Sequence, residues 1–235
     1  MKEIIRAENA GFCFGVRQAI EKAEKAAESA SEEGKRIFSM GSLIHNERVT
    51  GDLEKKGIKI IHSLEDVQSA DQVIIRSHGE GKAFYEEAEA KGVELIDATC
   101  PFVAKIHKLV YETDKQVVIV GDAKHPEVMG IFGWGRKPAI VVSSYEEAAA
   151  VAEDDFFVVT QTTIRAAMLN DVIKAFEDNG KVFEVNNTIC SATSKRQESC
   201  EKLAKESDLM VVIGGKNSSN TKKLYDISKK YCPNS

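Results

Sequence analysis

The sequence predicts an α/β fold built from three similar units, each with a small, mostly parallel sheet. Short runs rich in Val and Ile end in polar loops and are followed by helical patterns. This order is typical of parallel strands that are buried on both faces. In addition, the series strand, polar turn, cysteine, helix recurs three times. Its cysteines, Cys13, Cys100 and Cys190, lie 87 and 90 positions apart, which indicates a repeated unit.

The predicted strands follow from these runs in chain order. Five of them end in polar residues: "KRIFSMGSLIHN", "DQVIIRSHGE", "KQVVIVGDAKHPE", "DDFFVVTQTT" and "LMVVIGGKNSSN". Three more precede the cysteines, in "IIRAENAGFCFGVRQAIEKAE", "VELIDATCPFVAKIHKLVYE" and "VFEVNNTICSATSKRQESCEKLAKE", and a helix is expected after each cysteine. Parallel sheets bind ligands beyond the carboxyl ends of their strands, so the polar loops are the expected site.

The repeat predicts unit boundaries at residues 1–99, 100–186 and 187–235. The segment from Cys190 to the last residue has only 46 residues, about half of the earlier spacing. We therefore expect the third unit to be incomplete at its C-terminal side, with a sheet that leaves an edge exposed.

The composition narrows the class of protein. The chain has 235 residues, 43% of them hydrophobic, and a formal charge of −5 without an extended basic block. That pattern argues against nucleic-acid binding. The first residues lack the apolar core of a signal peptide, and no apolar run approaches the roughly 20 residues that span a bilayer. We expect a cytoplasmic protein that binds neither membranes nor nucleic acid.

The cysteines indicate a metal centre. Their number is odd and no C-x-x-C pair occurs, which argues against a disulfide framework and a zinc ribbon. At the start of a helix, the helix dipole and free N–H groups favour the thiolate. Three units around a pseudo-threefold axis would bring Cys13, Cys100 and Cys190 to one point. Cys200 is expected in a helical core, and Cys232 has no assigned role.

Three thiolates leave open which metal they bind. An iron–sulfur cluster held by three cysteines keeps one iron free for a substrate. Zinc with three cysteines and a water is the alternative metal, and three buried structural cysteines would need no metal at all.

The polar loops add candidate residues for an anionic ligand. His45, His78 and His125 each follow a predicted strand, whereas His62 and His107 are expected on the surface or in packing. Imidazole, hydroxyl and amide donors at strand ends and helix starts suit a phosphate group. The other members of this set are Gln161, Thr162, Thr163, Ser218, Ser219 and Asn220.

Glu127 has two possible roles on the sequence alone. Beside a cluster and a phosphate, its carboxyl group would have a raised pKa and could deliver a proton near neutral pH. Alternatively, it caps the helix that begins at "PEVMGIFGWG".

These motifs together resemble one family. "GFCFGV", "SLIHN", "RSHG", "DATCP", "HPEVMG", "TQTT", "TICSAT" and "KNSSN" occur in the order found in the LytB (IspH) family of 4-hydroxy-3-methylbut-2-enyl diphosphate reductases. Each motif is weak alone, but eight in order over nearly the whole chain are specific. The resemblance implies a trefoil of three α/β units around a central [4Fe–4S] cluster, with three cysteine ligands and one open iron. It also implies a monomer.

The resemblance further implies an oxidoreductase of isoprenoid biosynthesis, acting in the last step of the methylerythritol phosphate route. This step removes the allylic hydroxyl group and forms isopentenyl and dimethylallyl diphosphate. Reduced ferredoxin or flavodoxin would supply the electrons. Carried over by motif, Cys13, Cys100 and Cys190 bind the cluster. Glu127 is the proton source, Thr162 relays the proton or orients the hydroxyl, and His125 lines the pocket. The implied substrate-binding set is His45, His78, His125, Thr162, Ser218, Ser219 and Asn220.

One departure leaves other functions open. Members of this family continue past residue 235 with a strand and a serine-containing turn that helps to hold the diphosphate. A non-catalytic iron–sulfur sensor or scaffold of the same fold is therefore one alternative. A zinc-dependent hydrolase with Glu127 as base is another. Glu127, Thr162 and the strand-end histidines favour the reductase, because a sensor needs only the cysteines.

Overall fold

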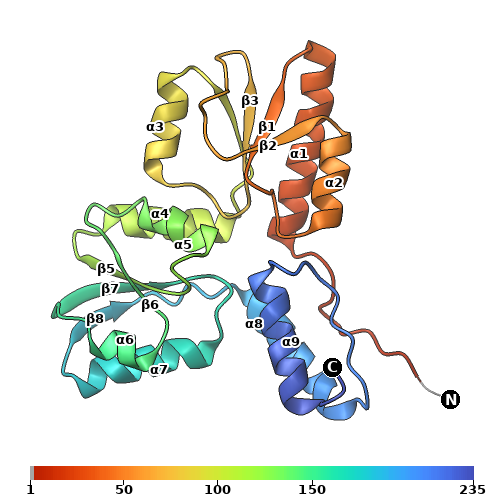
Figure 1. Cartoon of the computed structure of the whole chain (residues 1–235). Coiled ribbons are helices and arrows are strands. Elements are labelled where there is room, and N and C mark those ends of the chain that lie inside the picture. The colour runs from red at the N-terminus through yellow and green to blue at the C-terminus, as the bar shows by residue number, and fades with distance from the viewer. Residues whose placement is uncertain (1–2) are drawn as a thin grey trace.

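The computed structural model describes residues 3–235, and two parallel sheets form its core. The first sheet lies at the top of Figure 1 and has the strand order β2-β1-β3-β4. Its strands are β1 (Ile37–Met40), β2 (Ile58–Ile61), β3 (Gln72–Ile75) and β4 (Glu94–Asp97). All neighbouring pairs are parallel, so every strand ends at the same edge of the sheet.

The second sheet repeats this arrangement. Its order is β6-β5-β7-β8, and all of its pairs are parallel as well. The strands are β5 (Gln116–Val120), β6 (Ile140–Val142), β7 (Asp155–Thr160) and β8 (Val182–Val185). The shared order agrees with the sequence repeat, and the prediction of small parallel sheets in an α/β fold is confirmed.

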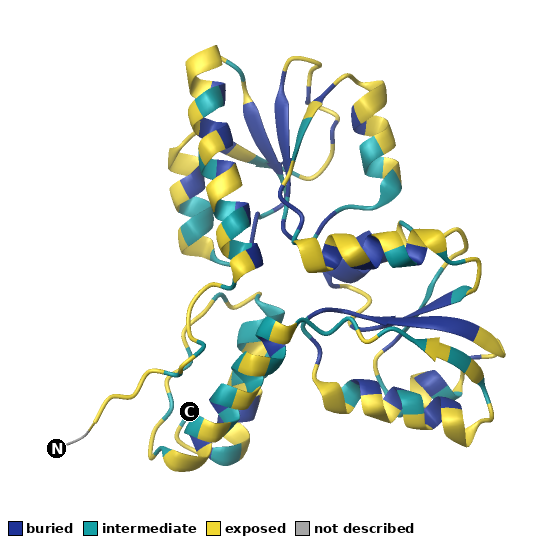
Figure 2. Ribbon diagram, turned by 180° about the vertical axis from the view of Figure 1, so that it is seen from behind, coloured by how far each residue is buried: buried dark blue, intermediate teal, exposed yellow. Residues whose placement is uncertain are grey.

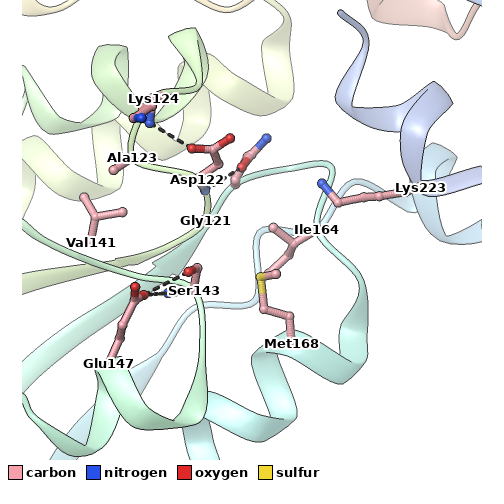
Figure 3. A pocket seen from close by; sticks show the side chains of 11 residues that line it. Gly121, Asp122, Ala123, Lys124, Val141, Ser143, Glu147, Ile164, Met168 and Lys223 are labelled. Carbon is pink, nitrogen blue, oxygen red and sulfur yellow. Dashed lines mark hydrogen bonds between the residues drawn. The ribbon is translucent and has the colours of Figure 1, made fainter. Parts of the chain in front are cut away.

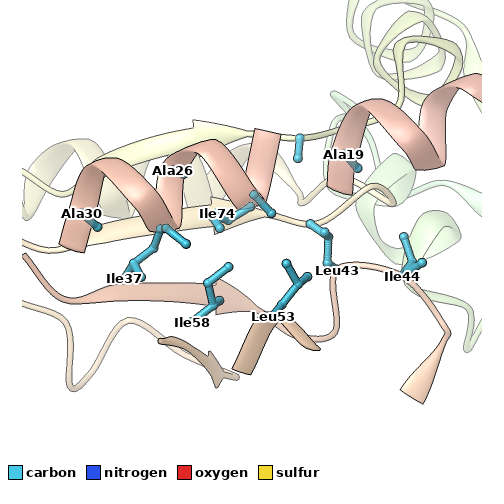
Figure 4. Packing of buried hydrophobic residues seen from close by; sticks show 12 residues of the cluster. Ala19, Ala26, Ala30, Ile37, Leu43, Ile44, Leu53, Ile58 and Ile74 are labelled. Atoms are coloured by element: carbon cyan, nitrogen blue, oxygen red, sulfur yellow. The ribbon is translucent and has the colours of Figure 1, made fainter. Parts of the chain in front are cut away.

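Helices cover both faces of the first sheet. One face packs against α1 (Phe14–Glu33) and α2 (Glu47–Lys55), and the other against α3 (Lys82–Ala90). Figure 4 shows the first of these cores, in which a stripe of small residues lets α1 approach Ile74. In β3, Val73 and Ile74 point to opposite faces, and both are fully buried. This explains why the run "VII" in β3 is continuously apolar rather than alternating.

The second sheet is covered in the same way. The helices α4 (Pro101–Glu112) and α5 (Pro126–Phe132) pack on one face, with Ile106 and Ile131 fully buried. The helices α6 (Tyr145–Ala149) and α7 (Ala166–Asp178) pack on the other. There the rings of Phe156 and Phe176 lie 4.6 Å apart in an edge-to-face arrangement. Figure 2 shows the buried strands between their half-exposed helices.

The last part of the chain is a pair of helices, α8 (Ser191–Glu206) and α9 (Ser219–Tyr231), which pack against each other. Cys200 joins them, because its Sγ lies 3.2 Å from the Ser228 hydroxyl group. The Cys232 Sγ lies 3.3 Å from the Ser207 carbonyl oxygen. The expectation that Cys200 is a core residue agrees with this geometry.

Two predicted strands do not form. Neither "IIRA" nor the run "LMVVIGG" is part of a sheet within the described residues. A strand needs the backbone of a neighbour to satisfy its N–H and C=O groups, and these segments have no such ladder. The second alternates in exposure, with Leu209, Val211 and Ile213 exposed. Its apolar pattern is therefore a strand pattern without a partner strand.

The strand order fixes where a ligand can bind. In the first sheet β1 and β3 are neighbours, and the chain continues from β1 to β2 on one side and from β3 to β4 on the other. The loops that follow β1 and β3 therefore diverge and leave a crevice between them. In the second sheet the loops after β5 and β7 do the same. The outer strands β4 and β8 lead directly to Cys100 and Cys190, which begin the helices α4 and α8.

Candidate active site

The candidate residues lie in these four loops and at the start of α9. His45 follows β1, His78 follows β3, His125 and Glu127 follow β5, and Thr162 follows β7. The two sheets meet through their loops, where glycines allow close backbone contact. A Cβ atom on Gly133 would lie 2.6 Å from the Cα of Gly81.

The three histidines form one group. The ring centroids of His45 and His78 are 4.5 Å apart, and those of His78 and His125 are 5.5 Å apart. Their ligating nitrogen atoms all lie within 4.8 Å of one another. Burial lowers the pKa of each ring, and that of His125 falls to about 4. The group is therefore neutral in the free protein, which leaves its N–H groups ready for an anion.

Two of these rings have unused polar atoms. The Nε2 of His45 and the Nδ1 of His78 are buried without a hydrogen-bond partner in the described chain. The Nδ1 of His125 accepts the backbone N–H of Glu127 at 3.2 Å, so its proton resides on Nε2. Buried polar atoms are rarely left unpaired, so such atoms indicate a ligand.

Glu127 is deeply buried and accepts two hydrogen bonds from Thr162. Its side chain is 2% exposed. The Thr162 backbone N–H donates to Oε1 at 2.5 Å, and the Thr162 hydroxyl group donates to Oε2 at 2.8 Å. Burial raises the pKa of the carboxyl group to about 6, despite these bonds and the charge of Lys223. The His125 ring caps the helix, so the Glu127 carboxyl group is not its cap.

The start of α9 contributes hydroxyl and amide groups. Ser218 caps the helix by accepting the Thr221 N–H at 3.2 Å. Ser219 contacts the loop after β7, since its Oγ lies 3.1 Å from the Thr163 hydroxyl oxygen. The Asn220 Oδ1 is buried without a partner among the described residues.

The three cysteines each cap a helix that starts near the centre of the molecule. Cys13, Cys100 and Cys190 are the N-cap residues of α1, α4 and α8, and all are half-buried. A Cβ atom on Gly15 would lie 2.5 Å from the Cys100 Sγ, so only glycine fits there. Figure 1 shows these helix starts converging.

The thiols act on one another electrostatically. The pKa of Cys100 is raised, first by burial and further by Cys13 and Cys190, against the lowering effect of two backbone N–H groups. The expectation that the helix start favours the thiolate is therefore outweighed at Cys100 in the free protein. Three sulfur donors that repel one another as anions fit a group that brings compensating positive charge.

The three cysteine-capped helices share an unusual charge pattern. None has an acidic residue in its first turn, although acidic residues are favoured there. Their first seven residues instead carry Arg17, Lys105, Lys195 and Arg196. Arg17 and Arg196 donate to the carbonyl groups of Phe12 and Gly11, both at 2.8 Å, which ties α1 and α8 to the Cys13 loop.

Exposed aromatic residues lie in the same region. Phe12 and Phe14 flank Cys13 and are 41% and 60% exposed, and Phe102 is 43% exposed two residues after Cys100.

Two charged residues near the site had no role in the sequence analysis. Arg76 follows β3 and pairs with Glu80 at 2.8 Å, and its charge lowers the pKa of all three histidines. Lys223 lies one turn into α9 and donates to the Ser219 Oγ at 2.6 Å. The quoted "RSHG" contains Arg76, but no sequence pattern marks Lys223.

Two cavities adjoin this region. One of about 280 Å³ lies at the carboxyl edge of the second sheet, and Figure 3 shows Lys223 of α9 reaching toward it from the opposite side. Gln161 also lines it. A second, of about 170 Å³, is lined by the His45 loop, α2 and the segment Gly215–Asn217, and Gly215 lies directly against the His45 carbonyl group.

The remaining histidines agree with the expected packing and surface roles. His107 is 5% exposed, and its ring stacks on Trp134 at 5.4 Å. Among the described residues, no helix is both long enough and apolar enough to cross a membrane.

The chain resembles known proteins over nearly its whole length. The family model described as "LytB protein" matches residues 4–235. The 4-hydroxy-3-methylbut-2-enyl diphosphate reductase of Caldanaerobacter subterraneus subsp. tengcongensis is 46% identical over 99% of this chain and 82% of its own. The protein of that name from Clostridioides difficile is 40% identical over 97% and 82%.

Solved structures agree with these relatives. The E-1-hydroxy-2-methyl-but-2-enyl-4-diphosphate reductase from Plasmodium falciparum matches with a TM-score of 0.88 at 30% identity. The match covers 94% of this chain and 71% of that one. A structure of (E)-4-hydroxy-3-methyl-but-2-enyl diphosphate reductase, described as the terminal enzyme of the non-mevalonate pathway, matches with a TM-score of 0.74 at 41% identity. That match covers 100% and 84% of the two chains. The trefoil predicted from the motifs is the fold of these neighbours. Together, the family model, the relatives and the shared fold place this chain in the LytB family.

Proposed function

We infer that the chain catalyses the reductive removal of the hydroxyl group from 4-hydroxy-3-methylbut-2-enyl diphosphate. The reaction breaks the allylic C–O bond and consumes two electrons and two protons. It releases water together with isopentenyl or dimethylallyl diphosphate, as the last step of the methylerythritol phosphate route. The observation that carries this inference is the buried Glu127–Thr162 pair, which lies beside three histidines with unpaired nitrogen atoms.

For the cofactor, we propose a [4Fe–4S] cluster held by Cys13, Cys100 and Cys190. When bound, such a cluster supplies single electrons and an open iron that acts as a Lewis acid on the leaving oxygen. The sulfur-only donor set and the room left by Gly15 beside the Cys100 Sγ support it. We further propose that residues 1–99, 100–186 and 187–235 are the three units that meet there.

For the substrate, we propose that the three histidines bind the diphosphate together with the start of α9. Among the described residues, His45 and His78 each have a ring nitrogen atom without a hydrogen-bond partner. The side-chain amide oxygen of Asn220 is also unpaired there, and the NH₂ group of the same amide can donate a hydrogen bond to phosphate. Ser218 and Ser219 add hydroxyl groups at a helix N-terminus, which favours anions. His125 lines the pocket between these groups. Binding at the diphosphate would hold the reacting carbon in place.

For the proton, we propose Glu127 as the source and Thr162 as the residue that relays it or orients the substrate hydroxyl group. A carboxyl group with a pKa of about 6 is partly protonated near neutral pH, and bound anions would raise its pKa further. Burying a carboxyl group lowers the stability of the fold. An iron–sulfur sensor has no use for a buried acid, whereas the reductase reaction needs a proton donor. This favours the reductase over the sensor or scaffold.

For the electrons, we propose that a small acidic carrier, a reduced ferredoxin or flavodoxin, docks on a monomer of this chain. The docking surface would consist of Phe12, Phe14 and Phe102 with Lys105 and Lys195, all exposed beside the cysteine-capped helix starts. Aromatic residues with surrounding cations suit a transient complex with an acidic partner.

The direct test is the turnover of Glu127→Gln. Removing the acidic proton should lower kcat by at least about 100-fold, the usual contribution of general acid catalysis. Iron content should stay unchanged. The assay is anaerobic, with reduced methyl viologen as electron source, and Glu153→Gln, an exposed change in the loop before β7, is the control. Near-normal turnover of Glu127→Gln would remove Glu127 as proton source.

A further inference from the structure

Lys223 occupies a position that the proposed roles leave unexplained. It is half-buried on α9, yet its ammonium group reaches across to the loops of the second sheet (Figure 3). Its Nζ lies 2.6 Å from the Ser219 Oγ. Burial lowers the pKa of Lys223, so the fold bears a cost to place a cation there.

The hydrogen bonds around Ser219 explain what this cation does. The Ser219 oxygen accepts from Lys223, and it also accepts from the Thr163 hydroxyl group at 3.1 Å. Thr163 is the donor of the second bond, and its own oxygen accepts from the Gln161 NH₂ group at 2.9 Å. The same NH₂ group lies 3.5 Å from the Ser219 oxygen, so donors surround that oxygen on this side. Among the described residues the Ser219 hydroxyl group donates no hydrogen bond, which leaves its hydrogen free for a ligand.

Gln161 is fixed in turn. Its side-chain oxygen accepts the Asp122 backbone N–H at 3.1 Å, which orients the NH₂ group toward Thr163. The network thus runs from the loop after β5 through the loop after β7 to α9. It joins the second sheet to the helix that carries Ser219 and Asn220.

Lys223 also faces Glu127. The two groups act on each other through their charges, since Lys223 lowers the pKa of Glu127 and Glu127 raises that of Lys223. The other charged groups that face Lys223 are Asp122, Arg165 and Lys222. Apart from burial, the groups that shift the pKa of Glu127 are the two hydrogen-bond donors of Thr162 and the charge of Lys223.

We propose that Lys223 is a positioning residue: it turns the Ser219 hydroxyl group into an obligate donor for the substrate diphosphate. This proposal rests on the proposed function and adds a residue to it. Ser219 accounts for one of the three ammonium hydrogens, so two remain for the bound anion or for water.

The test compares Lys223→Met with Lys223→Arg, and Lys222→Met is the matched control because Lys222 is the exposed neighbour on the same turn. The first readout is calorimetric binding of inorganic diphosphate to the anaerobic holoenzyme. Lys223→Met should weaken binding by about tenfold, the usual effect of losing a charge-assisted hydrogen bond. Lys223→Arg should restore most of it, and Lys222→Met should leave it unchanged.

A double-mutant cycle with Ser219→Ala separates positioning from a merely structural role. If Lys223 acts through Ser219, then Ser219→Ala should cost affinity in the wild-type background and little in Lys223→Met. Equal losses in both backgrounds would overturn the proposal. Iron content and thermal unfolding of each variant show whether it is folded, and Lys223→Leu, which also removes the donor, provides the cycle if Lys223→Met is not.

If the wild-type enzyme shows no viologen-driven turnover, the proposed function fails instead, whereas the diphosphate-binding cycle still tests Lys223.

Discussion

Glu127 is the residue whose environment differs most from what its sequence position suggests. At the second position of α5 a glutamate normally interacts with the helix N-terminus, but here His125 takes that place. The carboxyl group instead turns to Thr162 of the next loop and is removed from water. The carboxyl group is buried and, within the described chain, has no arginine or lysine in direct contact, so its pKa rises to about 6. A fraction of the protein therefore carries a protonated Glu127 near pH 6, as a general acid requires.

This environment predicts a pH-dependent stability difference between the wild-type chain and Glu127→Gln. The folded pKa of about 6 lies above the ordinary value of 4.5, so the folded state holds the proton more tightly than the unfolded state. Wild-type stability should therefore match the variant below pH 4.5 and fall relative to it as pH rises from 4.5 through 6. The loss above that window is about 2 kcal/mol. Thermal unfolding of both proteins between pH 4.5 and 8 measures it, and a constant difference would contradict the burial argument.

Helix starts are the elements that assemble the proposed cluster site. Each of α1, α4 and α8 begins at a cysteine, has no acidic residue in its first turn, and carries its first charged residue, a cation, within the first seven positions. Cations at a helix N-terminus are unfavourable for the isolated helix, so they indicate an anionic neighbour. The proposed cluster and an acidic electron carrier both meet that need, and exposed Phe14 and Phe102 favour the carrier at the surface.

Reversing these charges separates the two explanations. The variant Lys105→Glu/Lys195→Glu should raise the KM for an acidic ferredoxin at least about tenfold at low salt, and the difference should shrink as salt screens the charges. Turnover with methyl viologen and iron content should not change, because both side chains are exposed. The control reverses two exposed lysines at helix C-terminal ends, Lys55 of α2 and Lys229 of α9. Loss of iron in the first variant would assign these cations to the cluster rather than to docking.

At the scale of the whole molecule, the site exists because two sheets with the same strand order face each other. Each sheet presents its crevice loops, and α9 adds the third side. Glycines at the contact, such as Gly81 against Gly133, allow the loops to approach closely enough for the histidines to group. The Trp134 indole donates to the Glu80 carbonyl oxygen at 2.9 Å across this contact.

Much of this arrangement could be predicted from the sequence, and the exceptions have physical reasons. The Val- and Ile-rich runs that became β1, β3, β5 and β7 were recognisable because both of their faces are buried. "LMVVIGG" has the same pattern but no neighbouring strand, which local sequence cannot reveal. Lys223 was not recognised, because its role depends on how α9 is oriented toward the second sheet. The half-buried Arg76–Glu80 pair likewise depends on the fold around it.

The central claim is that Cys13, Cys100 and Cys190 hold a cluster beside the diphosphate site. The most direct measurement is the iron and sulfide content and the visible spectrum of anaerobically purified protein, titrated with 4-hydroxy-3-methylbut-2-enyl diphosphate. Cys200→Ser is the matched control for Cys190→Ser, since Cys200 contacts Ser228 within the α8–α9 core. We predict about four irons per chain in the wild type and in Cys200→Ser, with a spectrum that shifts on adding the diphosphate, and no cluster in Cys190→Ser. A chain that loses its colour through Cys200→Ser but not Cys190→Ser, or whose spectrum ignores the diphosphate, would contradict the account.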